Sequence, residues 1–271
     1  MAPTYFGFYG NGYEFWGDAI DQTRGFSNLN FLNGSSGPLL ADQLERTRAN
    51  GQRAIISVGH MLFESPSTVP KELYLETFTW WWEDLRAKDV VVALLLADEP
   101  FRTNDKWVKL PPAVVHQNLN NAATFVKLLT GKAVCMSASG PEYDQWGVPT
   151  DMDWVGMYRY SYNTHWLQLM GSFLNLVRLK RKQQKIMAVV DAYADDAHPI
   201  DESRIKAFDE WWKTLVNGYY GSDVVAVCPF LYQSTKMGDT NVWGAASMPR
   251  VLAELQGWGM NIMRSASSWA A

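Results

Sequence analysis

Two hydrophobic patterns alternate along the chain from its beginning to its end. Short apolar runs, rich in β-branched and aromatic residues, are typical of strands that are buried on both faces. Longer segments with apolar residues three and four positions apart are typical of amphipathic helices. The predicted strands cover residues 4–10, 27–33, 53–60, 90–97, 132–137, 153–158, 185–191 and 224–232. The predicted helices cover residues 13–24, 39–49, 67–88, 113–129, 165–182, 203–219 and 246–256.

This alternation of eight strands with helices predicts an α/β protein, built as a single (β/α)8 TIM barrel over residues 1–271. A helical pattern follows seven of the strands, and the exception is the loop-like segment 140–150. A doubly wound open sheet is the alternative. It is disfavoured because Phe15 stands where a G-x-G-x-x-G phosphate fingerprint beginning at Gly10 needs its third glycine.

The apolar run 90–97 ends abruptly at Asp98, Glu99 and Pro100. A proline cannot donate a hydrogen bond to a neighbouring strand, so the strand is expected to end there. Closed barrels place their chemistry at the carboxyl ends of their strands, which is where the two carboxylates would lie. Neighbouring side chains of a strand point to opposite faces, so only one of the two is expected to face the central pocket. The alternative is that these acids merely start a loop or cap a helix.

In a barrel, the side chains at the strand ends assemble into one ring, which here is polar, acidic and aromatic. The ring has no lysine for a Schiff base, and the first strand has no His-x-His pair, so we expect neither a cofactor nor a dinuclear metal site. His60 is expected to form hydrogen bonds rather than to bind a metal. The ring residues are Tyr9, Asn11, Asn33, His60, Asp98, Glu99, Ser137, Ser139, Tyr158, Tyr160, Asp191, with Asp195 and Asp196 beyond it, Tyr232, Gln233 and Trp243.

Two carboxylates that face each other across an aromatic pocket suit glycoside hydrolysis. One carboxyl group protonates the leaving oxygen, and the other attacks the anomeric carbon or activates a water. The fourth and seventh strands lie on roughly opposite sides of an eight-stranded ring, so Glu99 and Asp191 are the candidate catalytic pair. The expected partner is an oligo- or polysaccharide. The candidate substrate-binding residues are Asp98, His60, Tyr9, Asn11, Tyr158, Tyr160, Tyr232, Trp243 and Trp146.

Aromatic residues are abundant, with 13 Trp, 12 Tyr and 12 Phe, which provide flat apolar surfaces on which sugar rings can stack. Most of them are nevertheless expected in the core. The tryptophans at 80–82 and 211–212 lie in predicted helices, and we expect them to pack these helices onto the barrel or to form a subunit contact. Trp146, in the loop-like segment, is the better candidate for a substrate platform.

The formal net charge of −4 argues against binding to nucleic acid or to an anionic membrane surface. Cys135 and Cys228 lie in apolar strand-like runs, which predicts buried free thiols rather than a disulfide or a metal site. The first residues lack the pattern of a signal peptide, and no apolar stretch has the length of a membrane span, so we expect a soluble protein. The sequence leaves localisation and oligomeric state open.

The motif Asp98-Glu99-Pro100 resembles the Asn-Glu or Asn-Glu-Pro motif at the end of strand four in clan A, the superfamily of retaining (β/α)8 glycoside hydrolases. The resemblance implies that Glu99 is the acid/base and that Asp98 stands where the superfamily has an Asn that binds the sugar 2-hydroxyl. It also implies that Tyr158 or Tyr160, together with Trp243, lines the sugar subsite.

The chain departs from this superfamily at two positions. Asp98 replaces the Asn, which changes the local charge. The superfamily's nucleophile is a Glu at the end of strand seven, but this chain has no Glu between Glu142 and Glu202, and Asp191 is the nearest substitute. The missing Glu motivates an alternative function, a catalytically inactive barrel that binds a glycan. A further alternative is a metal-assisted hydrolase or lyase that uses His60 with the three carboxylates at the ends of strands four and seven.

Overall fold

Eight parallel strands form the central sheet of the protein, which we describe from a computed structural model. The structure describes residues 3–12, 18–64, 68–101, 110–159, 164–196, 201–218, 221–237 and 239–267. The order of the strands around the sheet is β1, β9, β7, β6, β5, β4, β3 and β2. Their bounds are β1 Tyr5–Phe6, β2 Leu29–Asn33, β3 Arg53–Ser57, β4 Val91–Asp98, β5 Ala133–Ser139, β6 Trp154–Tyr158, β7 Lys185–Val189 and β9 Val224–Val227.

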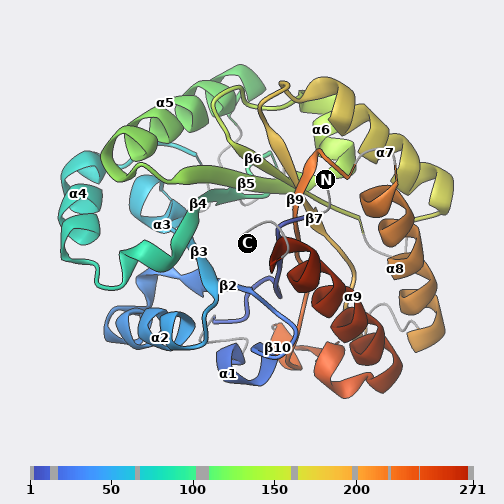
Figure 1. Cartoon of the computed structure of the whole chain (residues 1–271). Coiled ribbons are helices and arrows are strands. Elements are labelled where there is room, and N and C mark those ends of the chain that lie inside the picture. The colour runs from blue at the N-terminus through green and yellow to red at the C-terminus, as the bar shows by residue number, and fades with distance from the viewer. Residues whose placement is uncertain are drawn as a thin grey trace.

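The sheet closes almost completely into a ring, because β1 and β2, at its two ends, lie next to each other. The backbone N–H of Asn28 donates to the carbonyl of Phe6 at 3.0 Å, and that of Gly12 donates to the carbonyl of Phe31 at 2.8 Å. Helices lie between successive strands and surround the ring (Figure 1). This arrangement confirms the predicted (β/α)8 barrel.

The helices differ widely in length. Their bounds are α1 Ile20–Thr23, α2 Pro38–Ala49, α3 Gly59–Leu62, α4 Tyr74–Asp84, α5 Pro112–Thr130, α6 Gly140–Trp146, α7 Trp166–Leu179, α8 Glu202–Asn217 and α9 Pro249–Ser267. Short 3-10 segments are η2 Gly34–Ser36, η3 Lys88–Val90 and η5 Ala245–Ser247.

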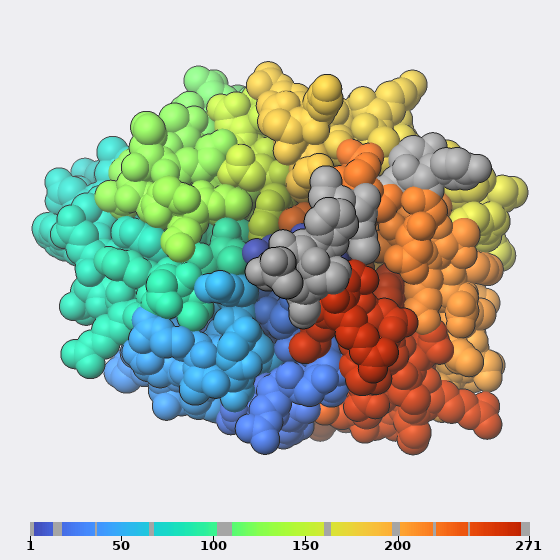
Figure 2. Space-filling view, in the orientation of Figure 1, coloured from blue at the N-terminus to red at the C-terminus, as the bar shows by residue number. Residues whose placement is uncertain are grey.

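The first and last parts of the chain meet at one side of the ring, where α9 packs against β1. A Cβ atom at Gly259 of α9 would lie 2.1 Å from the carbonyl oxygen of Phe26, so this close approach requires a glycine. In the space-filling view, the blue N-terminal part and the red C-terminal part accordingly lie side by side (Figure 2). The last helix, α9, continues to Ser267 and so extends well past Gly257, where the sequence predicted its end.

The segment 140–150, predicted to be a loop, begins instead with α6. The backbone N–H of Glu142 donates to the Ser139 hydroxyl at 3.3 Å, and the Glu142 carboxylate accepts from the N–H of Ser139 at 2.7 Å. This reciprocal pair is a capping box, which satisfies donors at the start of a helix. The helix predicted over 67–88 is shorter than expected, because α4 begins at Tyr74 and ends at Asp84.

A second, antiparallel sheet extends the barrel beyond the ends of β7 and β9. It consists of β8 Tyr193–Asp195, β10 Thr235–Met237 and β11 Thr240–Gly244, in the order β10, β11, β8. Because β8 follows β7 and β10 follows β9 in the chain, this small sheet lies at the carboxyl ends of the barrel strands, beside the expected site.

The apolar core has an inner part inside the ring and an outer part between the strands and the helices. Trp82 and Trp212 belong to the outer part, which confirms that they pack helices onto the barrel, whereas Trp80 is 67% exposed. Cys135 and Cys228 are buried free thiols, as predicted.

Candidate active site

A bulge in β4 decides the face on which Asp98 lies. Before the bulge, Ala93 and Leu95 belong to the inner core. The register with β5 then shifts between Leu95 and Ala97, so that Ala97 packs against the outer core and Asp98 pairs with Ser137. One extra residue reverses the alternation of a strand. Asp98 therefore takes an inward position that strict alternation would have given to Ala97.

Glu99 leaves the strand with a left-handed backbone, at a φ of 51°. This conformation costs a residue other than glycine roughly 1–2 kcal/mol. The N–H of Glu99 donates to the carbonyl of Ser137 at 2.8 Å, and its carboxylate accepts a hydrogen bond from the hydroxyl of Tyr158, whose ring belongs to the inner core. The expectation that only one of the two acids faces the inside is wrong, because the bulge and the left-handed residue bring both there. We call Asp98 and Glu99 the β4 pair.

Asp98 has a high pKa for a carboxyl group. Loss of hydration among the surrounding protein groups, followed by the charge of Glu99, raises the pKa of Asp98 from 3.8 to about 7. Hydrogen bonds with Tyr9 and Ser137 lower this pKa and so oppose the shift. The side chain nevertheless keeps a solvent-accessible surface. Asp98 therefore remains accessible from solvent, and its carboxyl group is partly protonated near neutral pH.

Two predicted aromatic residues join the β4 pair. Tyr9 is 4% exposed, packs against Phe31 with ring centroids 4.6 Å apart, and hydrogen-bonds Asp98. Tyr158, at the end of β6, is 9% exposed and donates to Glu99. The structure thus brings together residues from the ends of β1, β4, β5 and β6.

His60 lies in α3, directly after β3, and is partly buried. Burial, followed by the charge of Lys71, lowers the pKa of His60 below its ordinary value of 6.5. The imidazole is therefore neutral near pH 7, which suits a hydrogen-bonding role.

Asn11 and Tyr232 lie in the protein interior. The amide of Asn11, which is 2% exposed, donates to Thr23 at 3.1 Å and to Asn30 at 2.7 Å. Tyr232 is 8% exposed and packs in the outer core against Phe8, with ring centroids 4.9 Å apart. The structure does not bring these two side chains into the β4 group.

Asp191 follows β7, as predicted, but its side chain is completely buried, with 0% exposed surface. Its backbone forms a bridge with Phe230, next to β9. Asp209 of α8 also has 0% exposed surface, and burial, followed by the charge of Asp191, raises the pKa of Asp209 well above 3.8. We call Asp191 and Asp209 the buried pair.

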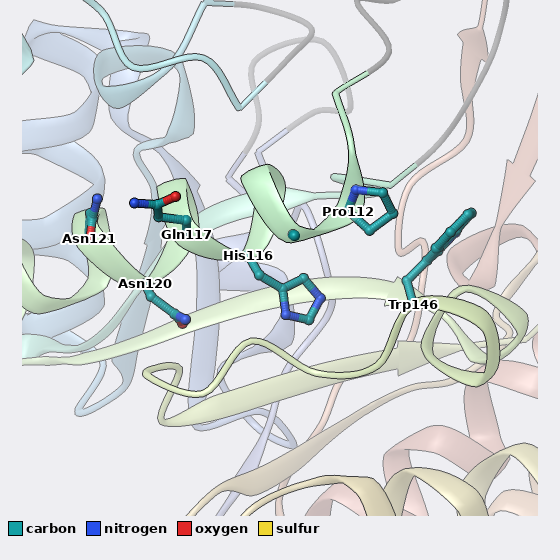
Figure 3. A pocket seen from close by; sticks show the side chains of 7 residues that line it. Pro112, His116, Gln117, Asn120, Asn121 and Trp146 are labelled. Carbon is teal, nitrogen blue, oxygen red and sulfur yellow. The ribbon is translucent and has the colours of Figure 1, made fainter.

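The two predicted tryptophans lie on the periphery. Trp243 is on β11, opposite Ala194 of β8, and is 41% exposed. Trp146 ends α6 and lines a surface pocket of about 630 Å³ together with the first turns of α5 (Figure 3). Tyr160, the remaining predicted residue, lies outside the described residues.

Both polar and apolar side chains line the pocket beside Trp146. Burial lowers the pKa of His116, although a hydrogen bond to the backbone of Trp146 opposes the shift. The ring of His116 lies 5.4 Å from that of Phe101, which comes two residues after Glu99. This single ring contact connects the pocket with the segment that carries the β4 pair. The lining residues are Pro112, Ala113, His116, Gln117, Asn120, Asn121 and Trp146.

Glu142 is a group near the site that the sequence interpretation did not select. Its charge contributes to the raised pKa of Asp98. The Ser-x-x-Glu spacing of the capping box, which includes Ser139, is the signal in the sequence that could have revealed both α6 and this carboxylate.

Within the described ranges, no group of three or more His, Cys, Asp or Glu side chains is arranged so that it could hold a metal ion. None of the helices in the same ranges is long and apolar enough to cross a membrane.

Comparison with known proteins identifies relatives in structure but not in sequence. No protein-family profile and no curated protein matches the chain. The Bifidobacterium dentium β-glucuronidase complexed with coumarin-3-O-glucuronide matches with a TM-score of 0.62 and 13% identity, over 96% of this chain and 47% of that one. The Ruminococcus gnavus β-glucuronidase matches with a TM-score of 0.59 and 12% identity, over 95% and 49%.

A shorter protein, β-glucosidase 1317, matches with a TM-score of 0.59 and 12% identity, over 92% of this chain and 90% of that one. The Bacteroides uniformis β-glucuronidase 2 is much longer, and the match spans only 31% of it. At these identities the likeness establishes the fold alone, which is a barrel shared with glycoside hydrolases.

Proposed function

We propose that the protein is a glycoside hydrolase that cleaves an oligo- or polysaccharide by carboxylate acid/base chemistry at the carboxyl ends of the barrel strands. The observation that carries the proposal is the β4 pair, two adjacent carboxylates turned to the inside of the ring, one of them bound by the Tyr158 hydroxyl. The shared fold with glycoside hydrolases supports it at a coarser level.

Glu99 is the proposed general acid and base. It protonates the leaving glycosidic oxygen and then accepts a proton from the attacking water. The hydrogen bond from Tyr158 fixes the direction of its carboxylate. Its left-handed backbone supports the assignment, because strained residues that persist are concentrated at functional sites.

Contact with the sugar is proposed for the predicted residues with accessible surface or with a place beside the β4 pair. Asp98, Tyr9, Tyr158 and His60 offer polar groups, and Trp243 and Trp146 offer aromatic faces. Asn11, Tyr232 and Asp191 are 2%, 8% and 0% exposed. In the proposed reaction these three support the barrel wall and do not touch the substrate.

A glycan-binding barrel without turnover is the second candidate. The complete burial of Asp191 favours it, because the carboxylate expected to act opposite Glu99 has no accessible surface. Binding of a glycan without release of product, over a wide pH range, would be its signature.

The test is hydrolysis of a panel of 4-methylumbelliferyl glycosides and soluble polysaccharides, with binding measured in parallel by calorimetry. We expect Glu99→Gln to lower kcat/KM by about 10³-fold or more. The matched control is Glu76→Gln on the exposed face of α4, which should leave kcat/KM unchanged. Full activity in Glu99→Gln would refute the assignment, and binding without hydrolysis in the wild type would favour the second candidate.

A further inference from the structure

The site has two carboxylates on one strand, and among the described residues the carboxylate at the end of β7, where a barrel glycosidase needs its nucleophile, has no accessible surface. Asp191 is 0% exposed, Asp195 of β8 is 9% exposed, and the exposed Asp196 beyond it accepts hydrogen bonds from Asn241 of β11. A carboxylate that attacks an anomeric carbon must reach within about 3–3.5 Å of it. A nucleophile from the end of β7 is therefore not available to a sugar that lies against the β4 pair.

The substrate can supply the missing nucleophile. Some glycosidases lack a protein nucleophile and use the acetamido group on C2 of the sugar, whose carbonyl oxygen attacks C1 of the same ring. Such a reaction requires two carboxyl groups of the protein. One carboxyl group must protonate the leaving oxygen, and a second, next to it, must accept the N–H of the acetamido group.

We propose that the substrate is a 2-acetamido-2-deoxy glycoside with its aglycone trans to the acetamido group, that Glu99 is its acid/base, and that Asp98 binds its amide N–H. This inference rests on the proposed function and names the substrate class of the same site. Two adjacent carboxylates that both face the inside of the ring are the arrangement this reaction needs.

The surroundings of Asp98 suit an amide donor. Tyr9 and Ser137 hydrogen-bond its carboxyl group from the protein side, while part of the side chain stays open to solvent. An N–H group can only donate, so it requires Asp98 to be ionised. A sugar hydroxyl has no such requirement, because it can both donate and accept.

The steps balance without any other reactant. In the first step, the acetamido oxygen forms a bond to C1, the glycosidic C1–O bond breaks, and the leaving oxygen takes the proton of Glu99. The positive charge on the resulting oxazolinium ring is spread toward the nitrogen, whose N–H faces the Asp98 carboxylate. In the second step, water attacks C1, Glu99 accepts its proton, the bond between C1 and the acetamido oxygen breaks, and the acetamido group is restored with retention at C1.

The experiment compares substrates that differ only at C2. The pairs are the 4-methylumbelliferyl β-glycosides of N-acetylglucosamine and glucose, and of N-acetylgalactosamine and galactose. We expect kcat/KM for the acetamido member of at least one pair to exceed that of its hydroxyl partner by about 10²-fold or more, because the oriented internal nucleophile is lost with the acetamido group. Replacing the acetyl methyl by trifluoromethyl, which weakens the carbonyl oxygen as a nucleophile, should lower kcat about 10-fold or more.

Inhibition provides a second readout. A thiazoline fused to the sugar at C1 and C2 mimics the oxazolinium ring, and we expect it to compete with substrate and to bind more weakly to Asp98→Asn than to the exposed control Asp84→Asn of α4. Equal or faster cleavage of the hydroxyl glycosides without thiazoline inhibition would overturn this inference and leave the proposed function in place. Absence of hydrolysis of every glycoside in the wider panel would overturn both.

Discussion

The β4 pair and the buried pair have the same chemistry and opposite surroundings. Asp98 keeps accessible surface and Glu99 accepts a hydrogen bond at the inner side of the ring, whereas Asp191 and Asp209 are both 0% exposed. Neither carboxyl oxygen of Asp209 has a hydrogen-bond partner in the part of the chain that the structure describes. A carboxyl group at a strand end is therefore not a site by position alone, and access decides which pair can meet a substrate.

The largest expected difference between the two pairs is in catalysis. We expect Asp98→Asn to lower kcat/KM by about 10²–10³-fold, because it removes the group beside the acid/base. Asp191→Asn should change kcat/KM of the folded protein by less than about 3-fold, since its side chain is out of reach of the substrate. Steady-state kinetics, normalised to the folded fraction from circular dichroism, measure both. An equal loss in Asp191→Asn would show that Asp191 takes part in catalysis despite its burial.

The pH dependence of kcat/KM separates the pairs further. The pKa of Asp98 is raised to about 7, so Asp98 gains a proton as the pH falls through about 7. We expect kcat/KM for an acetamido glycoside to fall below that point, because Asp98 then loses the charge that binds the acetamido N–H. Asp98→Asn should remove this acidic limb, whereas Asp209→Asn should leave it in place. An acidic limb that persists in Asp98→Asn would assign the proton to another group.

The buried pair should instead control stability. Asp209 has a folded-state pKa raised by burial, so it stays protonated at a pH where the unfolded carboxyl group has ionised. Its contribution to the free energy of unfolding is greatest below an unfolded pKa of about 3.9 and is lost as the pH rises toward the folded pKa.

Asp209→Leu, which keeps the side-chain shape, should therefore raise the free energy of unfolding at pH 7 by about 1–3 kcal/mol. The gain should shrink as the pH falls toward 4, and urea titration at several pH values measures it. The exposed control Asp84→Leu should stay within about 0.5 kcal/mol of the wild type. A gain that does not depend on pH would show that ionisation of Asp209 is not its cause.

The sequence predicted the barrel well, because strand and helix periodicities are local and were repeated along the chain. It also predicted the position of the β4 pair, since an apolar run that stops at two acids and a proline is a local signal. The capping box at Ser139 and Glu142 was equally local, and it was overlooked.

The orientation of side chains at the site could not be predicted in the same way. The bulge in β4 depends on how Ala97 and Asp98 pair with the neighbouring β5, which is a contact between distant parts of the chain. The burial of Asp191 depends on packing around β7, where Asp209 of α8 comes close to it. Accessibility is set by such tertiary contacts, so alternation along one strand could not distinguish the two pairs.

The smallest expected effect concerns the backbone of Glu99, and it compares two ways of removing the same side chain. Among the described residues, Ala87 and Glu99 are the non-glycine residues with positive φ, so neither member of the buried pair shares this strain. Glu99→Ala and Glu99→Gly both remove the carboxylate and its hydrogen bond, and they differ only in how readily the new residue adopts the left-handed conformation. We expect Glu99→Gly to be more stable than Glu99→Ala by about 1 kcal/mol in urea titration.

The matched pair at Glu76, in the first turn of α4, should show the opposite sign, because glycine in a helix is less favourable than alanine by up to about 1 kcal/mol. A reversal of sign between the two positions would show that the fold holds Glu99 in a conformation that its side chain resists. Neither Glu99 variant should have activity. If Glu99→Gly is also more stable than the wild type, the protein keeps a less stable residue at the position where the chemistry is proposed. If glycine is the less stable choice at both positions, the left-handed backbone stores no strain, and the argument for Glu99 then depends on its neighbours Asp98 and Tyr158 alone.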